Sequence, residues 1–247
     1  MPVFQRLFLS LSLSAFALFS SSIFSAYAET LSSASSNSKA VSSQQKRTLD
    51  QAITEFSSGA RQALLPHFQH VDIQYPPEKV TLLAIKERHI IEVWATSGGQ
   101  TRFIKQYFIW SASGEVGPKL TEGDKQVPEG IYQITGLNPN SKFHLSMALN
   151  YPNAFDLKWA KAEGRDNPGS DIFIHGKSYS VGCLAVGDKN IEELFILAVD
   201  TGIRNIEVII APEDPRKKPL IPKESDPDWV RMLYKDIESA FLPYSFK

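Results

Sequence analysis

The sequence is poor in cysteine. Cys183 is the only one in 247 residues, so no disulfide can form within the chain. It also lacks an excess of either charge, because 26 Lys and Arg stand against 27 Asp and Glu, and there is no run of like charge to indicate a nucleic-acid partner. We find no internal repeats. The remaining composition, 43% hydrophobic and 21% charged, is that of a globular chain with one sizeable core.

Residues 1–28 have the pattern of a secretory signal peptide. Arg6 gives a positive start, Leu7–Phe19 is apolar apart from small serines, and Ala26-Tyr27-Ala28 is an A-x-A cleavage site. An uncleaved anchor is the alternative, but the apolar core is short for a membrane span. We therefore expect export to the periplasm of a bacterial cell envelope, no stable membrane anchor after cleavage, and a Ser-rich linker over residues 29–45.

The single cysteine lies in the stretch Asp171–Asp188. A leftover thiol in an oxidising compartment is either buried, since free cysteine packs like a small apolar residue, or kept for chemistry. An apolar, strand-like run ends at His175, and Gly176 and Gly182 bracket the loop that leads on to Cys183. A loop that doubles back would bring imidazole to thiol. That arrangement favours a thiolate nucleophile near neutral pH.

The pattern H-G-x-x-x-S-x-G-C, which runs from His175 through Ser180 to Cys183, resembles the active-site motif of the YkuD-type L,D-transpeptidases. Its short spacing between histidine and cysteine is similar to that of the YafK-type branch. One position departs from the family pattern. Many members carry arginine two places after the cysteine, where this chain has Ala185.

Two upstream blocks extend the resemblance. Residues 117–130 are similar to the family's G-P-K and G-D-x-x-T-P-E-G segment, and residues 151–156 to its Y-P-N-x-x-D segment. The blocks stand in the family's order and cover roughly Val80 to Pro212. Each block is weak alone, and together they are specific.

Helical spacing of apolar residues predicts three helices, over residues 46–68, 189–200 and 225–242. Pro66 should help to end the first of them. Asp188 should cap the start of the second, and Gly202 should end it.

Runs rich in β-branched and aromatic residues predict the strands, with a turn at residues 138–140. Besides the run before His175, the predicted strands are 80–85, 90–95, 102–110, 131–135, 142–149 and 206–211. Together with the resemblance, they imply a mostly-β fold with peripheral helices, of α+β class, built on a YkuD-like β-sandwich. The expected parts are an N-terminal helical segment, the catalytic domain, and a C-terminal tail with an amphipathic helix: residues 46–79, 80–212 and 213–247.

The chemistry assigns a role to each residue of the motif. Cys183 is the candidate nucleophile, and His175 the candidate proton acceptor and donor. The backbone N–H groups of Gly182 and Cys183 are candidates for an oxyanion hole. Ser180 either bonds the histidine or shapes the loop, and Gly176 supports the same turn.

Four residues are candidates for a substrate pocket. His144 lies in a predicted strand, either on its solvated face or on a pocket wall. The resemblance makes Tyr151, Asn153 and Asp156 candidate substrate-side groups, while a simple turn would also use Asn153 and Asp156.

The resemblance implies an exported cysteine L,D-transpeptidase that acts on peptidoglycan stem peptides through a thioester. A hydrolase on the same scaffold is one alternative, either an L,D-carboxypeptidase or an amidase that releases a tethered envelope lipoprotein. A non-catalytic wall-binding module with a structural Cys183 is another. We expect no cofactor, no metal and no nucleic-acid partner.

Overall fold

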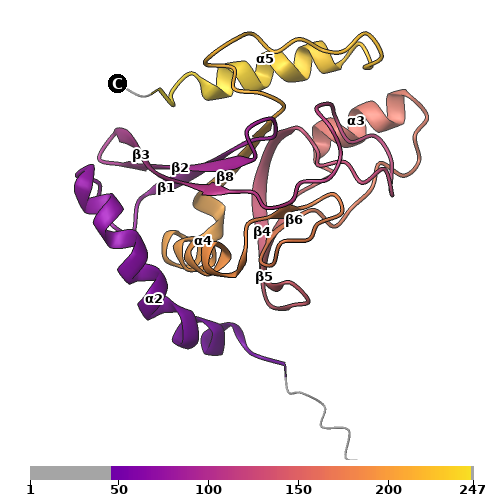
Figure 1. The fold of residues 1–247 in the computed structure, drawn as a ribbon. Helices are drawn as coiled ribbons and strands as arrows, with labels where there is room; N and C mark the ends of the chain where they lie inside the picture. The colour runs from indigo at the N-terminus through magenta and orange to yellow at the C-terminus, as the bar shows by residue number, and fades with distance from the viewer. Residues whose placement is uncertain (1–45, 246–247) are drawn as a thin grey trace, which may run out of the picture. The chain divides into compact units, whose positions relative to one another are not determined.

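The computed structural model describes residues 46–245. The expected signal peptide and Ser-rich linker lie outside these residues. The described part contains one sheet with the strand order β3-β2-β1-β8-β4-β5-β6-β7 (Figure 1). The strands are β1 Lys79–Ile85, β2 Ile90–Ser97, β3 Gln100–Phe108, β4 Gly130–Ser141, β5 His144–Leu149, β6 Phe173–His175, β7 Leu184–Ala185 and β8 Ile206–Ala211. The helices are α2 Leu49–His70, α3 Ala154–Ala162, α4 Asp188–Thr201, the 3₁₀ helix η1 Ile203–Asn205, and α5 Val230–Phe241.

The sheet is mixed and changes direction at β4. β1, β2 and β3 form an antiparallel meander, and β8 lies parallel to β1. β4 pairs with β8 through Gly130–Gln133 and with β5 from Ile134 onward, so this single long strand joins the two parts of the sheet. The expected α+β class with peripheral helices is confirmed, and the strands form one continuous bent sheet.

Helices cover both faces of the central strands. Leu82 and Ala84 of β1 belong to a core shared with α2 and α4, whereas Leu83 and Ile85 belong to a second core under α5. Because successive strand residues point to opposite faces, β1 needs apolar residues at nearly every position, and its sequence supplies them. Figure 1 shows α5 on one side of the sheet and α2 with α4 on the other.

The first helix runs slightly past its predicted end at residue 68, and Pro66, which was expected to help end it, lies inside it. α2 continues through this proline to His70. Proline removes one helical hydrogen bond, but the buried stripe Phe56, Ala60, Leu64 and Phe68 keeps the helix packed beyond it.

Two further local predictions were wrong, and one helix was missed. The turn between β4 and β5 lies at Lys142–Phe143, and residues 138–140 belong to the irregular end of β4. The helix α3 was not predicted at all. Asp188 is the first residue of α4 and does not cap it, because its carboxylate instead accepts a hydrogen bond from the backbone N–H of Lys177.

Candidate active site

His175 is the last residue of β6 and is almost completely buried, at 1% exposure. It pairs with Ser146 of β5 on one side and with Ala185 of β7 on the other. The ring of Phe143 stacks on the imidazole at 4.4 Å between centroids. These contacts fix the histidine between two strands and under an aromatic cover.

The imidazole also has a fixed orientation. Its Nδ1 lies 2.6 Å from the carbonyl oxygen of Gly176. A carbonyl only accepts, so Nδ1 carries the proton of the neutral ring and Nε2 has a lone pair. The backbone of Gly176 thus fills the place of a third group behind the histidine. No side-chain pattern in the sequence could have named it.

Cys183 lies directly before β7, on the same face of the sheet as His175. β6 and β7 are parallel and pair His175 with Ala185, so Cys183, two residues earlier, points to the same side as both of them. Its Sγ lies 3.5 Å from the carbonyl oxygen of Asp171 at the start of the opposing segment. The eight-residue loop therefore returns the thiol to the strand that carries the histidine.

Burial keeps both groups uncharged at neutral pH. It raises the pKa of the Cys183 thiol, although an N–H group of Phe173 and the charge of Lys119 oppose the rise. Burial also lowers the pKa of His175, against the opposing effect of the Gly176 carbonyl. The sequence indicated a resting thiolate, whereas the structure favours a neutral thiol and a neutral imidazole, because burial disfavours both charged forms.

The two candidate oxyanion amides are engaged in hydrogen bonds. The N–H of Gly182 donates to the hydroxyl of Ser113, and the N–H of Cys183 donates to the hydroxyl of Ser180 at 2.9 Å. The Ser180 hydroxyl in turn donates to the carbonyl oxygen of Cys183 at 2.7 Å. Of its two expected roles, Ser180 therefore has the loop-shaping one, since its bonds go to the backbone around the nucleophile.

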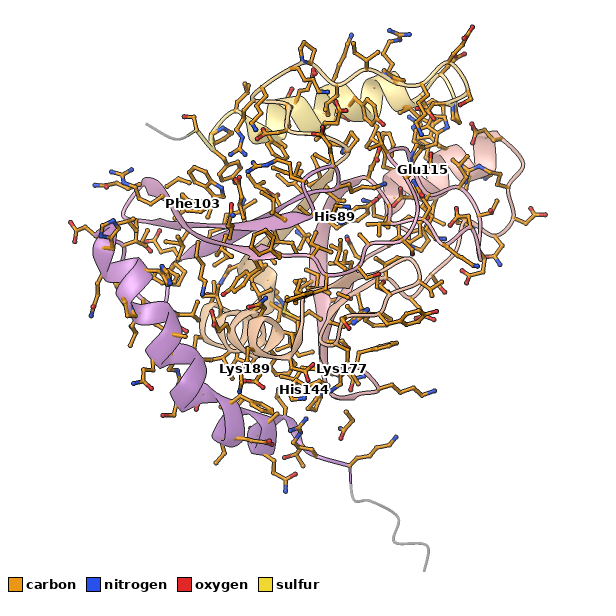
Figure 2. All side chains as sticks on the ribbon, in the orientation of Figure 1. His89, Phe103, Glu115, His144, Lys177 and Lys189 are labelled. Carbon is orange, nitrogen blue, oxygen red and sulfur yellow. The ribbon has the colours of Figure 1, made fainter. Side chains whose placement is uncertain are left out.

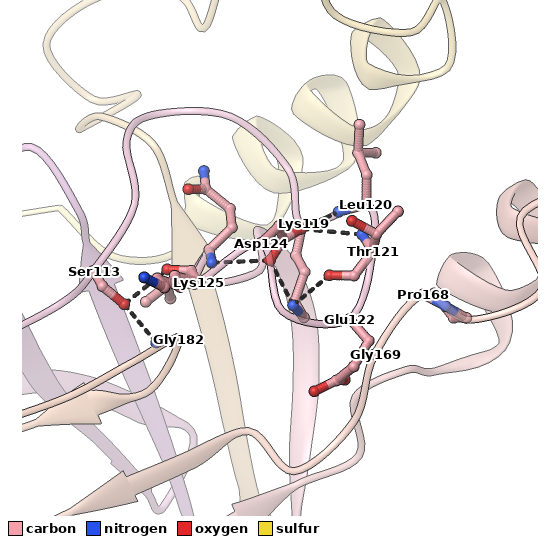
Figure 3. A network of polar contacts seen from close by, with 12 residues as sticks. Ser113, Lys119, Leu120, Thr121, Glu122, Asp124, Lys125, Pro168, Gly169 and Gly182 are labelled. Atoms are coloured by element: carbon pink, nitrogen blue, oxygen red, sulfur yellow. Dashed lines mark hydrogen bonds and ion pairs between the residues drawn. The ribbon is translucent and has the colours of Figure 1, made fainter.

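Ser113 was not among the candidates from the sequence, where it appears as one serine in a small polar run. It lies beside β7 because the neighbouring Ser111 forms a backbone bridge with Ala185. No motif marks it, and only the fold brings it to Gly182. Figure 3 shows Ser113 between Gly182 and Lys125, next to the polar network around Asp124.

His144 contacts residues of two helices. Its Nε2 lies 2.9 Å from a carboxylate oxygen of Glu192 on α4, and its ring packs edge-on against Phe56 of α2. Figure 2 labels it beside Lys177 and Lys189, near the start of α4. The structure thus places the partly exposed His144 side chain against α2 and α4.

Asn153 and Asp156 form the start of α3. The Asn153 side chain accepts the N–H groups of Phe155 and Asp156, and the Asp156 carboxylate accepts the N–H of Asn153, which makes a reciprocal capping box. Tyr151 is buried and donates its hydroxyl to the carbonyl of Pro168. Through these contacts Asn153 and Asp156 start α3, and Tyr151 binds the backbone at Pro168. None of these contacts is with Cys183.

Ala185, in place of the arginine common in the family pattern, is fully buried. Its N–H and carbonyl bond to Ser111 and Trp110, and its other neighbour is His175. Within residues 46–245, no group of three or more His, Cys, Asp or Glu side chains is arranged to hold a metal ion.

A half-buried cysteine directly before β7 and an oriented histidine at the end of the adjacent parallel strand β6 define a candidate cysteine acyl-transfer site. The L,D-transpeptidase catalytic domain family, YkuD, matches residues 71–210, more than half of the chain. The chain belongs to this family.

Among curated relatives, the chain is 30% identical over 139 residues to YafK of Escherichia coli K12, whose own assignment as an L,D-transpeptidase is provisional. The match covers 56% of this chain and 54% of YafK, so the chain spans about half the length of that relative. The resemblance to the YafK-type branch is confirmed.

Two solved structures have lower similarity. The helical cell shape determining protein Pgp2 from Campylobacter jejuni matches with a TM-score of 0.45 and 23% identity, over 55% of this chain and 48% of that one. Bd1075 from Bdellovibrio bacteriovorus matches with a TM-score of 0.41 and 22% identity, over 66% and 55%. Similarity at this level carries no functional argument.

Proposed function

We propose that this chain is an exported cysteine L,D-transpeptidase that acts on peptidoglycan stem peptides. The family assignment gives the substrate class. The observation that supports the chemistry is the anchored imidazole: Gly176 holds the Nδ1 proton of His175, which leaves Nε2 as a base on the face that Cys183 shares.

In the first half of the reaction, Nε2 of His175 takes the thiol proton as the sulfur of Cys183 bonds to the carbonyl carbon of the third, diamino-acid residue of the stem. The tetrahedral oxyanion collapses, the C–N bond breaks, and the imidazolium protonates the leaving D-amino acid. The result is a thioester on Cys183 and a neutral His175.

In the second half, an amine attacks the thioester and gives its proton to His175. The C–S bond breaks, and the imidazolium returns the proton to the sulfur. The oxyanion forms twice, so donors held in place for it accelerate both halves. We assign this role to the N–H groups of Gly182 and Cys183. Each is oriented by a serine hydroxyl in the resting site and shares its proton with the substrate oxygen as the oxyanion forms.

The acyl acceptor decides which enzyme of this class the chain is. A stem-peptide amine gives a transpeptidase, and a lysine of an envelope lipoprotein gives an attachment enzyme. Water gives a hydrolase, which would act as an L,D-carboxypeptidase or release such a lipoprotein. Export to the periplasm is part of the proposal and rests on residues 1–28. No helix within residues 46–245 is long and apolar enough to cross a membrane.

Purified tetrapeptide muropeptides test the proposal. We expect release of the terminal D-amino acid, together with a cross-linked dimer or a tripeptide product, and no product from Cys183→Ala. A dimer identifies the transferase and a tripeptide identifies the hydrolase. The absence of either product would favour a non-catalytic wall-binding module with a structural Cys183.

A further inference from the structure

Gly182 is the residue before the nucleophile. Because glycine has no Cβ, its backbone conformation is not fixed by its own side chain. Its φ is +90°, and glycine adopts positive and negative φ with similar ease. The residue is buried, so its N–H needs a partner within the protein. The orientation of the chain that enters Cys183 therefore depends on an external hydrogen bond.

Ser113 supplies that bond. Its hydroxyl accepts the N–H of Gly182 and donates to the carbonyl oxygen of Lys125 at 2.7 Å, so both sides of one hydroxyl are used (Figure 3). The backbone of Ser113 makes a further contact, because its carbonyl accepts the N–H of Val127. Ser113 thus joins the nucleophile loop to the segment around residues 119–127.

The segment on the far side of Ser113 is itself held in place. Asp124, one residue before Lys125, accepts hydrogen bonds from a buried lysine and from three backbone N–H groups (Figure 3). The donors are Lys119, Leu120, Thr121 and Gln126. Four hydrogen bonds hold the Asp124 carboxylate in place. The backbone of the next residue, Lys125, is therefore held too, and its carbonyl oxygen is a well-positioned acceptor for Ser113.

We infer that Ser113 is a positioning residue, which aligns the Gly182–Cys183 backbone so that sulfur and oxyanion donors meet a carbonyl group together. The inference rests on the proposed function only in treating Cys183 as a thiol that accepts acyl groups. Without the hydroxyl, the N–H of Gly182 loses its partner, and the glycine can rotate. The thiol would remain, but its position relative to the N–H groups of Gly182 and Cys183 would no longer be fixed.

Two reagents separate alignment from thiol reactivity. p-Nitrophenyl acetate acetylates Cys183 through a tetrahedral oxyanion: a C–S bond forms, the bond to p-nitrophenolate breaks, and the thiol proton passes to His175. Iodoacetamide alkylates the same sulfur by displacing iodide, and no oxyanion forms. Because Cys183 is the only cysteine, the rate in Cys183→Ala gives the background for both reagents.

Ser113→Ala should slow acetylation by about tenfold or more, as expected for small misplacements of catalytic groups. Alkylation should stay within about twofold of the wild-type rate, because only access to the sulfur matters. Ser113→Thr keeps a hydroxyl and should restore most of the acetylation. The matched control is Ser111→Ala, since the hydrogen bonds from Ser111 to Ala185 use its backbone.

Any other pattern overturns the inference. Faster acetylation in Ser113→Ala would mean that the hydroxyl blocks an oxyanion donor. Equal losses with both reagents, or no loss with either, would mean that Ser113 does not align the site. A wild-type protein that turns over no muropeptide but shows the selective loss would refute the proposed function and leave the inference standing.

Discussion

At the scale of single residues, burial shapes the proposed chemistry more than charge does. A thiol of raised pKa and an imidazole of lowered pKa form a neutral pair, so the proton moves during attack and not before it. The carbonyl of Gly176 matters here because it leaves only Nε2 to receive the proton.

The pH dependence of the two groups follows from these directions. Since the pKa of His175 is lowered, activity should persist below about pH 6.5, the ordinary histidine value, and fall only on further acidification as the imidazole protonates. The alkylation rate of Cys183 should rise with pH. The pH at which this rate reaches half its maximum should lie above about 8.5, the ordinary pKa of a thiol.

His175→Ala completes this test. Acylation should fall by at least about a hundredfold, the scale of a lost general base. The pH profile of alkylation should change little, because no imidazolium stabilises a resting thiolate. A profile that moves to higher pH in His175→Ala would show an ion pair, as the sequence first suggested, and would contradict the neutral pair.

At the scale of elements, prediction from the sequence succeeded where one pattern determined the outcome. The strands β1, β2, β3 and β8 lie within a few residues of their predicted bounds, because their runs of β-branched and aromatic residues have no competing signal. It failed where a residue has two possible uses. Asn153 was interpreted as a turn residue or a substrate group, but asparagine also starts helices, and α3 was missed for that reason.

The site shows the same limit. The candidates His175 and Cys183 could be named from the sequence because both residues stand in one short motif. Ser113 and the Gly176 carbonyl were not, since one is brought in by a bridge between distant segments and the other leaves no mark in a side-chain pattern.

Asp156 at the start of α3 should make stability depend on pH. Burial raises the pKa of Asp156 to about 6, above its ordinary value in an unfolded chain, so the folded state binds a proton that the unfolded state releases. Stability from this group is present at low pH and is lost as pH rises from about 4 through 6.

Asp156→Asn should remove that loss while keeping an oxygen for the capping box. We expect the stability difference, wild type minus Asp156→Asn, to decrease as pH rises from about 4 to 7. Urea unfolding at several pH values measures it. Asn153→Ala is the companion variant, and it should lose about 1 kcal/mol at every pH because the helix loses its cap. A difference that stays constant with pH would refute the assignment to Asp156.

At the scale of the whole molecule, helices beyond the predicted catalytic domain complete its core. α5 covers the second core, and Tyr234 on this helix donates its hydroxyl to the buried carboxylate of Glu129. Glu129 also pairs with the buried Lys86 at the end of β1. On the opposite face, α2 contributes Phe56 and Phe68 to the first core.

A chain shortened to residues 80–212 should therefore not fold cooperatively. It would expose apolar surface on both faces of the central strands and leave the pair Lys86 and Glu129 without the Tyr234 hydroxyl. Thermal unfolding followed by circular dichroism, with residues 46–245 as the matched control, measures the effect. A sharp transition near that of the control would show that the helices are additions to an independent domain.

The central claim is a covalent acyl-enzyme on Cys183. The direct measurement is the intact mass of the protein after mixing with a tetrapeptide muropeptide and quenching in acid within the first turnover. We predict an added mass equal to the muropeptide without its terminal D-amino acid, located on the peptide that contains Cys183 and absent from Cys183→Ala. Turnover of the muropeptide with no such adduct at any time, or with equal rates in Cys183→Ala, would contradict the account.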